Sequence, residues 1–217
     1  MKKINVRELN EILLITQRMN EIILDVPNTP IKYSRELFKG FPSTMLAFNL
    51  VKREAEEISS EAIYIKERKI DCSLNIIFKY IMAISHEMRH QYQTKIMYFN
   101  MDEYQDRREN NDTTSYNLQK EEIDAVAYAN LFMDEYFGIT PVYPEFNEFL
   151  LDEIRVRENL IEKQFFSSID EHDSELNSLY QSLIIEIKKF QPSNDNDNSF
   201  NNVYWWRKEK KWEKLKL

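Results

Sequence analysis

The segment 75-NIIFKYIMAISHEMRH-90 decides how the chain folds. Apolar residues fill most positions up to residue 84, which is typical of a helix that is buried on most sides. Two of the chain's three histidines, His86 and His90, follow at a spacing of four. One helical turn therefore places both imidazoles on the same face. We predict a buried helix over 75–99 that presents His86, Glu87 and His90 at one point.

The spacing of these three residues is the HExxH pattern, in which two histidines hold zinc and the glutamate polarises a zinc-bound water. Two helical histidines can also be hydrogen-bonded core residues or an exposed pair. A carboxylate buried beside two imidazoles without an ion is costly to desolvate, however. We therefore expect Zn²⁺ on His86 and His90, with Glu87 as the catalytic general base.

Zinc needs a third protein ligand and an open position for water. The metzincin pattern would place glycine and histidine where this chain has Gln93 and Ile96, so that pattern fails. Cys72 could supply a sulfur, as in peptide deformylases, but their glycine-cysteine signature is absent. The third option is a glutamate on a later helix, and EEIDAVAYA, Glu121 to Ala129, fits it well.

HEMRH followed by QKEEIDAVAYA resembles the gluzincin metallopeptidases, most closely the small ImmA/IrrE-like group. In that group an acidic helix with a pattern near E-x-E-A-N-x-F-A follows the zinc helix. Laid on this chain, the pattern starts at Glu122, which takes the ligand role, and matches its alanine at Ala125. The resemblance covers roughly residues 40 to 140 and implies a strand beside the cleft, for which 61–67 is suitable.

The chain departs from this group at one position. Those peptidases usually carry Asp or Asn four residues after the ligand glutamate to orient a zinc-bound histidine, and here that residue is Val126. Asp124 is our candidate substitute. The departure keeps a second function open, namely a zincin-fold binding or regulatory module that retains the metal but cleaves nothing.

Adjacent glutamates on a helix diverge by about 100°, so only one of Glu121 and Glu122 can bind the ion. The alanines three and seven residues after Glu122 lie on its side and allow close approach to the zinc helix. We therefore expect Glu121 to be a solvated or salt-bridged surface residue. Asp124 and Tyr128 should share its more polar face, which can reach solvent.

The tetrahedral intermediate of peptide hydrolysis needs a hydrogen-bond donor for its oxyanion. Our candidate is Tyr116, six residues before the ligand glutamate, and Tyr92, Tyr98 and Tyr104 are alternatives. Arg89 faces away from the two histidines on helical spacing, and we expect it to form a structural ion pair.

The rest of the chain predicts an α+β fold: a mainly helical, zincin-like domain with a small β-sheet beside the zinc helix, and a helical C-terminal extension. Apolar periodicity indicates further helices over 5–24, 117–136, 145–165 and 173–190, with Gly138 as a stop, and strands over 41–51 and 61–67. Residues 100–116 have the composition of an exposed, mobile loop. The expected organisation is a metallopeptidase domain over 1–140, the helical extension over 141–191, and a linker with an aromatic, basic arm over 192–217.

Composition bounds the partners and the compartment. A net charge of -8 argues against nucleic acid, and no apolar stretch approaches the roughly 20 residues that span a bilayer. The basic, aromatic arm could suit a membrane or nucleic acid, but we favour its docking on the domain or on a partner subunit. A single cysteine and no signal peptide favour the cytoplasm. The expected partner is a protein or peptide substrate, and the oligomeric state stays open.

Overall fold

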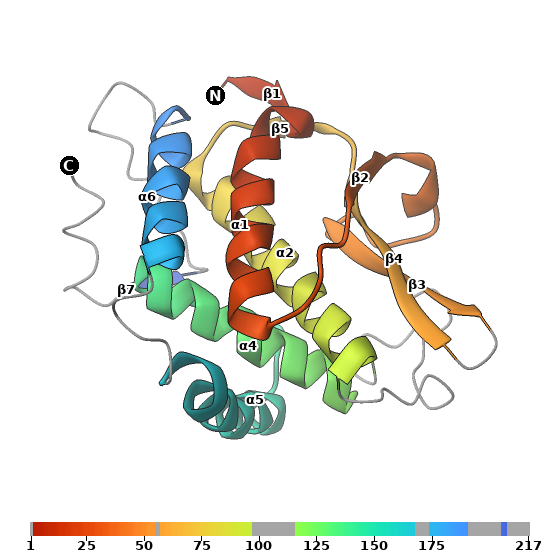
Figure 1. Ribbon diagram of the computed structural model, residues 1–217, viewed down its shortest axis with the longest axis vertical. Helices are drawn as coiled ribbons and strands as arrows, with labels where there is room; N and C mark the ends of the chain where they lie inside the picture. The colour runs from red at the N-terminus through yellow and green to blue at the C-terminus, as the bar shows by residue number, and fades with distance from the viewer. Residues whose placement is uncertain (1, 55–56, 97–115, 168–173, 191–204, 208–217) are drawn as a thin grey trace.

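The computed structural model describes residues 2–54, 57–96, 116–167, 174–190 and 205–207. They form a mainly helical protein with small sheets, which confirms the α+β class (Figure 1). The helices are α1 (Asn10–Leu24), α2 (Leu74–Ile96), α4 (Lys120–Phe137), α5 (Glu148–Ile161) and α6 (Ser174–Lys188), with 3-10 turns at Val6–Leu9 and Glu36–Phe38 and a π-helical turn at Glu162–Phe166. The strands are β1 (Lys3–Asn5), β2 (Ile31–Ser34), β3 (Ala47–Glu54), β4 (Glu57–Lys66), β5 (Lys69–Asp71), β6 (Ile139–Pro141) and β7 (Trp205–Arg207).

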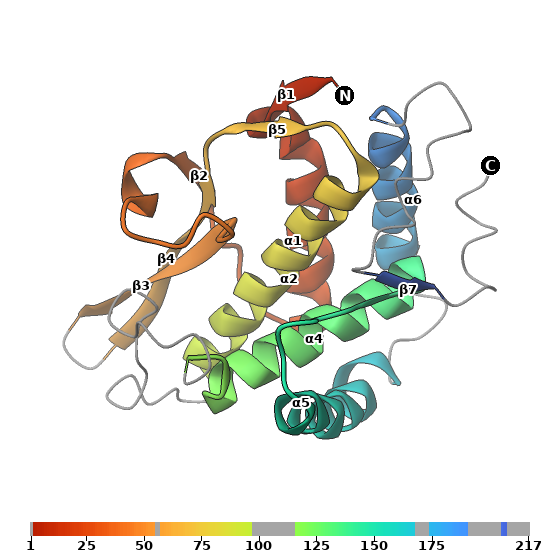
Figure 2. The ribbon, with the colours of Figure 1, turned by 180° about the vertical axis from the view of Figure 1, so that it is seen from behind.

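Helix α2 is the centre of the molecule. It contacts α1, α4, β3 and β4, so neighbours cover it on most sides, as its apolar sequence predicts. The three-stranded sheet lies to one side of the helices and α6 to the other (Figures 1 and 2). The buried apolar residues of α2 are Leu74, Ile77, Phe78, Tyr80, Ile81, Ile84, Met88 and Tyr92.

The sheet has the strand order β2-β4-β3, with β2 parallel and β3 antiparallel to β4. The two expected strands are present, but their bounds differ from the expected ones. The polar stretch 52–60, apart from residues 55–56, belongs to the β3–β4 hairpin. Strand β4 contains 61–67 except its last residue, yet it lies in the middle of the sheet. Strand β4 contacts α2, as expected for a strand beside this helix. Among the described strands β3 pairs only with β4, and the backbone N–H of its Asn49 donates to Glu87 of α2.

Two short ladders lie outside this sheet. β1 pairs with β5 just before α2, and β6 pairs with β7. Through β7 a segment of the expected arm docks on the domain by backbone pairing. The other residues of the arm, and the loop expected over 100–115, lie outside the described residues.

Helix α4 ends at Gly138, which adopts the left-handed conformation (φ 62°), as expected for a glycine stop. No helix in the described part of the chain has both the length and the apolar character needed to cross a bilayer.

The helical extension is integrated with the first 140 residues, since α5 contacts α4 and α6 contacts α1. This contact corrects one expectation. Asp124 and Tyr128 do not reach solvent: both are buried. Arg157 of α5 binds the Asp124 carboxylate, while Phe165 and Phe166 of the π-helical turn pack on the ring of Tyr128. The extension therefore covers the face of α4 that bears Asp124 and Tyr128, which the sequence of α4 alone predicts to be exposed.

A buried ion pair joins α2 to α4 beneath this cover. Arg89, fully buried, donates from Nε to Asp124 Oδ2 (2.7 Å) and from Nη2 to Asp124 Oδ1 (3.1 Å). Its guanidinium carbon lies 4.4 Å from the ring centroid of Tyr92 and 4.9 Å from that of Phe165. The two hydrogen bonds and the aromatic rings of Tyr92, Phe165 and Tyr128 replace part of the hydration that the guanidinium loses, and its Nη1 has no hydrogen-bond partner among the described residues. The expected structural role of Arg89 is confirmed.

Substitution Arg89→Met should therefore lower the free energy of unfolding by about 3–5 kcal/mol, because it removes one partner of a buried charge pair. Urea denaturation measures this loss. The control is Arg155→Met, since Arg155 forms an exposed pair with Asp152 and should contribute less than about 1 kcal/mol. Equal, small losses in both variants would contradict a buried, compensated pair.

Candidate metal centre

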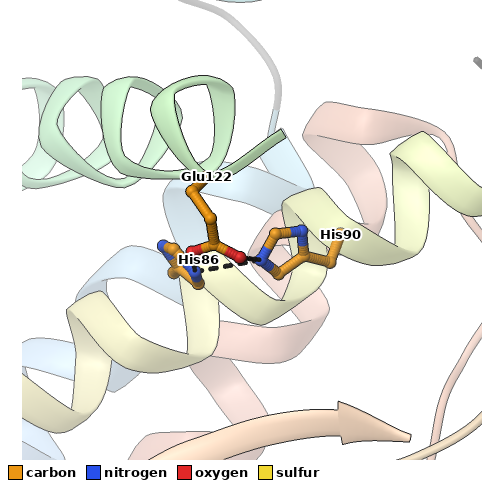
Figure 3. Close-up of side chains that lie close together, drawn as sticks. All are labelled: His86, His90 and Glu122. Carbon is orange, nitrogen blue, oxygen red and sulfur yellow. Dashed lines mark hydrogen bonds and ion pairs between the residues drawn. The ribbon is translucent and has the colours of Figure 1, made fainter. Parts of the chain in front are cut away.

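Three side chains from two helices meet at one point (Figure 3). His86 and His90 lie one turn apart on α2, and their Nε2 atoms are 3.0 Å apart. Glu122 reaches them from the first turn of α4: its Oε2 is 3.4 Å from His86 Nε2 and its Oε1 is 3.3 Å from His90 Nε2. The structure thus brings together the three residues for which the sequence predicts a shared ion.

The separations fit a common ion between the three donors. Ligands at about 2.0–2.1 Å from a tetrahedral zinc are about 3.3 Å from one another. Direct hydrogen bonds between an imidazolium and a carboxylate are shorter, about 2.7–2.9 Å. The two separations from Glu122, which involve its two different carboxylate oxygens, are close to those of ligands around one ion, while the 3.0 Å between the two imidazole nitrogens is shorter. Two imidazoles and a carboxylate are also a donor set that zinc accepts.

The electrostatics of the cluster favour a positive charge. Burial alone would raise the pKa of Glu122, but the imidazoles of His90 and His86 hold it well below its usual range. Burial would also lower the pKa of His90, yet the charge and hydrogen bond of Glu122 outweigh it and raise that pKa to about 9. A proton on His90 is therefore what a metal ion would replace.

Glu87 lies beside the two imidazoles and is nearly buried, at 8% exposure. Burial raises the pKa of its carboxyl group, and the neighbouring imidazoles of His86 and His90 act in the opposite direction. The backbone N–H of Asn49 on β3 donates to Glu87 Oε2 at 2.7 Å. The edge strand of the sheet therefore fixes the position of the expected general base.

The hydroxyl of Tyr116 lies in the cluster and donates to Glu122 Oε1 at 2.7 Å. The structure thus places our candidate oxyanion donor at the site, in contact with a ligand carboxylate, and its catalytic role stays a prediction. Of the three alternatives, Tyr92 packs against Arg89, while Tyr98 and Tyr104 lie outside the described residues.

Sequence reasoning missed one residue of the site. Gln93, which we considered only as the failed glycine position of the metzincin pattern, is buried, and its Oε1 lies 2.8 Å from His90 Nδ1. Its spacing of three from His90 on one helix was the available signal. We expected Asp124 to replace an Asp or Asn at position 126 as the residue that orients a ligand histidine. Its Oδ2 accepts a hydrogen bond from Gln93 Nε2 at 2.7 Å, so it is linked to His90 only through the Gln93 amide.

Two other candidate ligands lie apart from the cluster. The carboxylate of Glu121 pairs with the exposed Lys120 at 3.7 Å, as expected, but its side chain is only 12% exposed, so the expected surface position is wrong. The thiol of Cys72 precedes α2 and contacts the carbonyl oxygen of Phe190 at 3.6 Å.

No protein-family model matches this chain, and comparisons with curated proteins and with solved structures find no match either.

The geometry predicts opposite outcomes for the two adjacent glutamates. Glu122→Ala should abolish tight zinc binding, because it removes one of three protein ligands. Glu121→Ala should retain it, because that side chain is directed to Lys120. Zinc titration against a fluorescent chelator measures both affinities. A reversed order would move the third ligand to Glu121.

The raised pKa of His90, about 9, predicts how zinc affinity depends on pH. Zinc binds neutral imidazole, so His90 must lose its proton on binding. Affinity should therefore rise about tenfold per pH unit from about pH 6.5 to 8 and level off above the pKa. Titration calorimetry in two buffers of different ionisation enthalpy counts the released protons, and release of none would contradict the prediction.

Proposed function

We propose that this chain is a zinc-dependent metallopeptidase in which His86, His90 and Glu122 hold the ion and Glu87 is the general base. The observation that supports it most directly is the convergence of three metal-binding side chains with a buried carboxylate one residue after His86. The resemblance of HEMRH and its acidic helix to the gluzincin group points to the same chemistry.

When bound, zinc supplies a Lewis acid that lowers the pKa of water and polarises a carbonyl group. Glu87 accepts the proton of the attacking water and returns it to the leaving amine. We assign this proton transfer to Oε1 of Glu87, since Oε2 already accepts a hydrogen bond from the backbone N–H of Asn49. The hydroxyl of Tyr116 can donate to the oxyanion if it leaves Glu122 Oε1.

The edge of β3 supports a peptide as the substrate. Among the described strands β3 pairs only with β4, and its Asn49 amide is directed at Glu87. Extended peptides bind by adding a strand to a sheet edge. A peptide along β3 would therefore pass the general base, which suits an endopeptidase acting on a protein.

The second candidate is a zincin-fold binding or regulatory module that retains the metal without cleavage. The reason to consider this function is Val126, because a valine side chain cannot accept a hydrogen bond from a ligand histidine. The amide of Gln93 lies against His90 instead, so the orientation that catalysis requires has another source. This contact answers the doubt that Val126 raises, but it serves metal binding in either function, so only a cleavage assay separates the two.

Substitution Glu87→Gln separates the two functions. The variant should keep the fold and one zinc per chain but lose cleavage by at least about 100-fold, because an amide cannot accept the proton of water. Wild type and variant are incubated with a peptide library made from a proteome digest, and new termini are counted by mass spectrometry. Cleavage by the variant at the wild-type rate would exclude Glu87 as the base. Zinc-loaded wild type that cleaves nothing would favour the module.

A further inference from the structure

We propose that the helical extension is a working part of the metal centre: Arg157 of α5 positions Asp124, Asp124 positions Gln93, and Gln93 fixes the ring of His90. The inference rests on the proposed metal site. It assigns a role in metal binding to a residue 35 positions beyond the last ligand in sequence, on a helix that carries none of the proposed ligands.

The first link is the amide of Gln93. Its Nε2 lies 2.9 Å from the backbone oxygen of Glu121 and 2.7 Å from Asp124 Oδ2. A backbone carbonyl oxygen and the oxygen of an ionised carboxylate can only accept hydrogen bonds, and the two neighbouring arginines keep Asp124 ionised. The NH₂ end of the Gln93 amide must therefore face both oxygens. The oxygen end of the amide then faces His90 Nδ1, 2.8 Å away, and accepts a hydrogen bond from the Nδ1–H. A proton held on Nδ1 leaves the Nε2 lone pair for a metal.

The second link is the carboxylate of Asp124, which is buried between three partners. Oδ2 accepts from Gln93 and from Arg89 Nε, and Oδ1 accepts from Arg89 Nη2 and from Arg157 Nε. Because four donors from three side chains converge on two oxygens, this carboxylate has one favourable orientation. The orientation of Gln93 therefore depends on the donors that hold Asp124.

The third link is the extension itself. Arg157 lies on α5, and its side chain is 31% exposed, so it joins the buried carboxylate to the surface. Phe165 of the π-helical turn closes on the guanidinium of Arg89. The face of α4 that bears Asp124 is polar in sequence, and without α5 it would be open to water. The extension thus covers Asp124 and Gln93, which are both buried, and burial strengthens the hydrogen bond between them.

The residue against His90 is a neutral amide and not a carboxylate. Here the acceptor, Gln93, is on the histidine helix itself. A neutral amide needs an anchor to fix which of its ends faces His90, and Asp124 with Arg157 provides that anchor.

The test uses four variants of the full chain: Gln93→Met, Arg157→Gln, the conservative Arg157→Lys and the matched control Arg155→Gln. Arg155 lies on the same helix and pairs with an exposed aspartate, Asp152. Zinc affinity is measured by chelator competition. The stability of the metal-free protein is measured by urea denaturation, and the exchange rate of the His90 Nδ1 proton in the zinc form by NMR.

We expect Gln93→Met to weaken zinc binding about 10–100-fold, as removal of an outer-shell partner does. Arg157→Gln should weaken it in the same direction, by roughly tenfold, and Arg157→Lys should recover part of the loss. In both loss variants the Nδ1 proton of His90 should exchange faster. Arg155→Gln should leave affinity and exchange unchanged. A merely structural Arg157 would lower stability without changing the exchange of that proton.

The outcomes separate this inference from the proposed function. Wild-type zinc affinity retained by Gln93→Met, or unchanged exchange of the His90 proton in Arg157→Gln, would overturn the relay and leave the metallopeptidase intact. The predicted losses in a protein that cleaves no peptide would support the relay and overturn the enzyme. A wild type without zinc affinity would overturn both. Should Arg157→Gln not fold, Arg157→Lys decides: zinc affinity and His90 proton exchange like those of the wild type would overturn the role of Arg157, and a partial loss of both would support it.

Discussion

The carboxylate of Glu122, buried against two imidazoles of another helix, is the interaction on which the arrangement of α2 and α4 depends. A buried charge is tolerated only where opposite charge or a metal compensates it. The small side chains of Ala125 and Ala129, both fully buried, let the two helices come close enough for that compensation. Packing and metal chemistry therefore impose the same requirement on α4.

Much of this was visible in the sequence, because it depends on local spacing. Histidines four apart share a helix face, alanines three and seven residues after Glu122 mark its buried side, and Gly138 ends α4. What the sequence could not show depends on distant contacts. Strands of three or four residues, such as β2, have too few positions for a period to be read. The burial of Asp124 depends on α5, more than 20 residues later in the chain.

The helical extension changes how the site is understood. Taken alone, α2 and α4 carry all the proposed ligands, and the extension would be an accessory. Its Arg157 and Phe165 instead contact the ion pair of Arg89 and Asp124 that joins the two ligand-bearing helices. Stability and metal geometry thus share side chains, so a substitution in this network affects both unless a second measurement separates them.

Diffraction at the zinc absorption edge, from crystals of the zinc-loaded chain, tests most directly whether His86, His90 and Glu122 bind one zinc ion. We predict one anomalous peak between α2 and α4, about 2.0–2.2 Å from the Nε2 atoms of both histidines and from a carboxylate oxygen of Glu122. An anomalous map with its peak elsewhere, or with the two imidazoles turned apart, would contradict it.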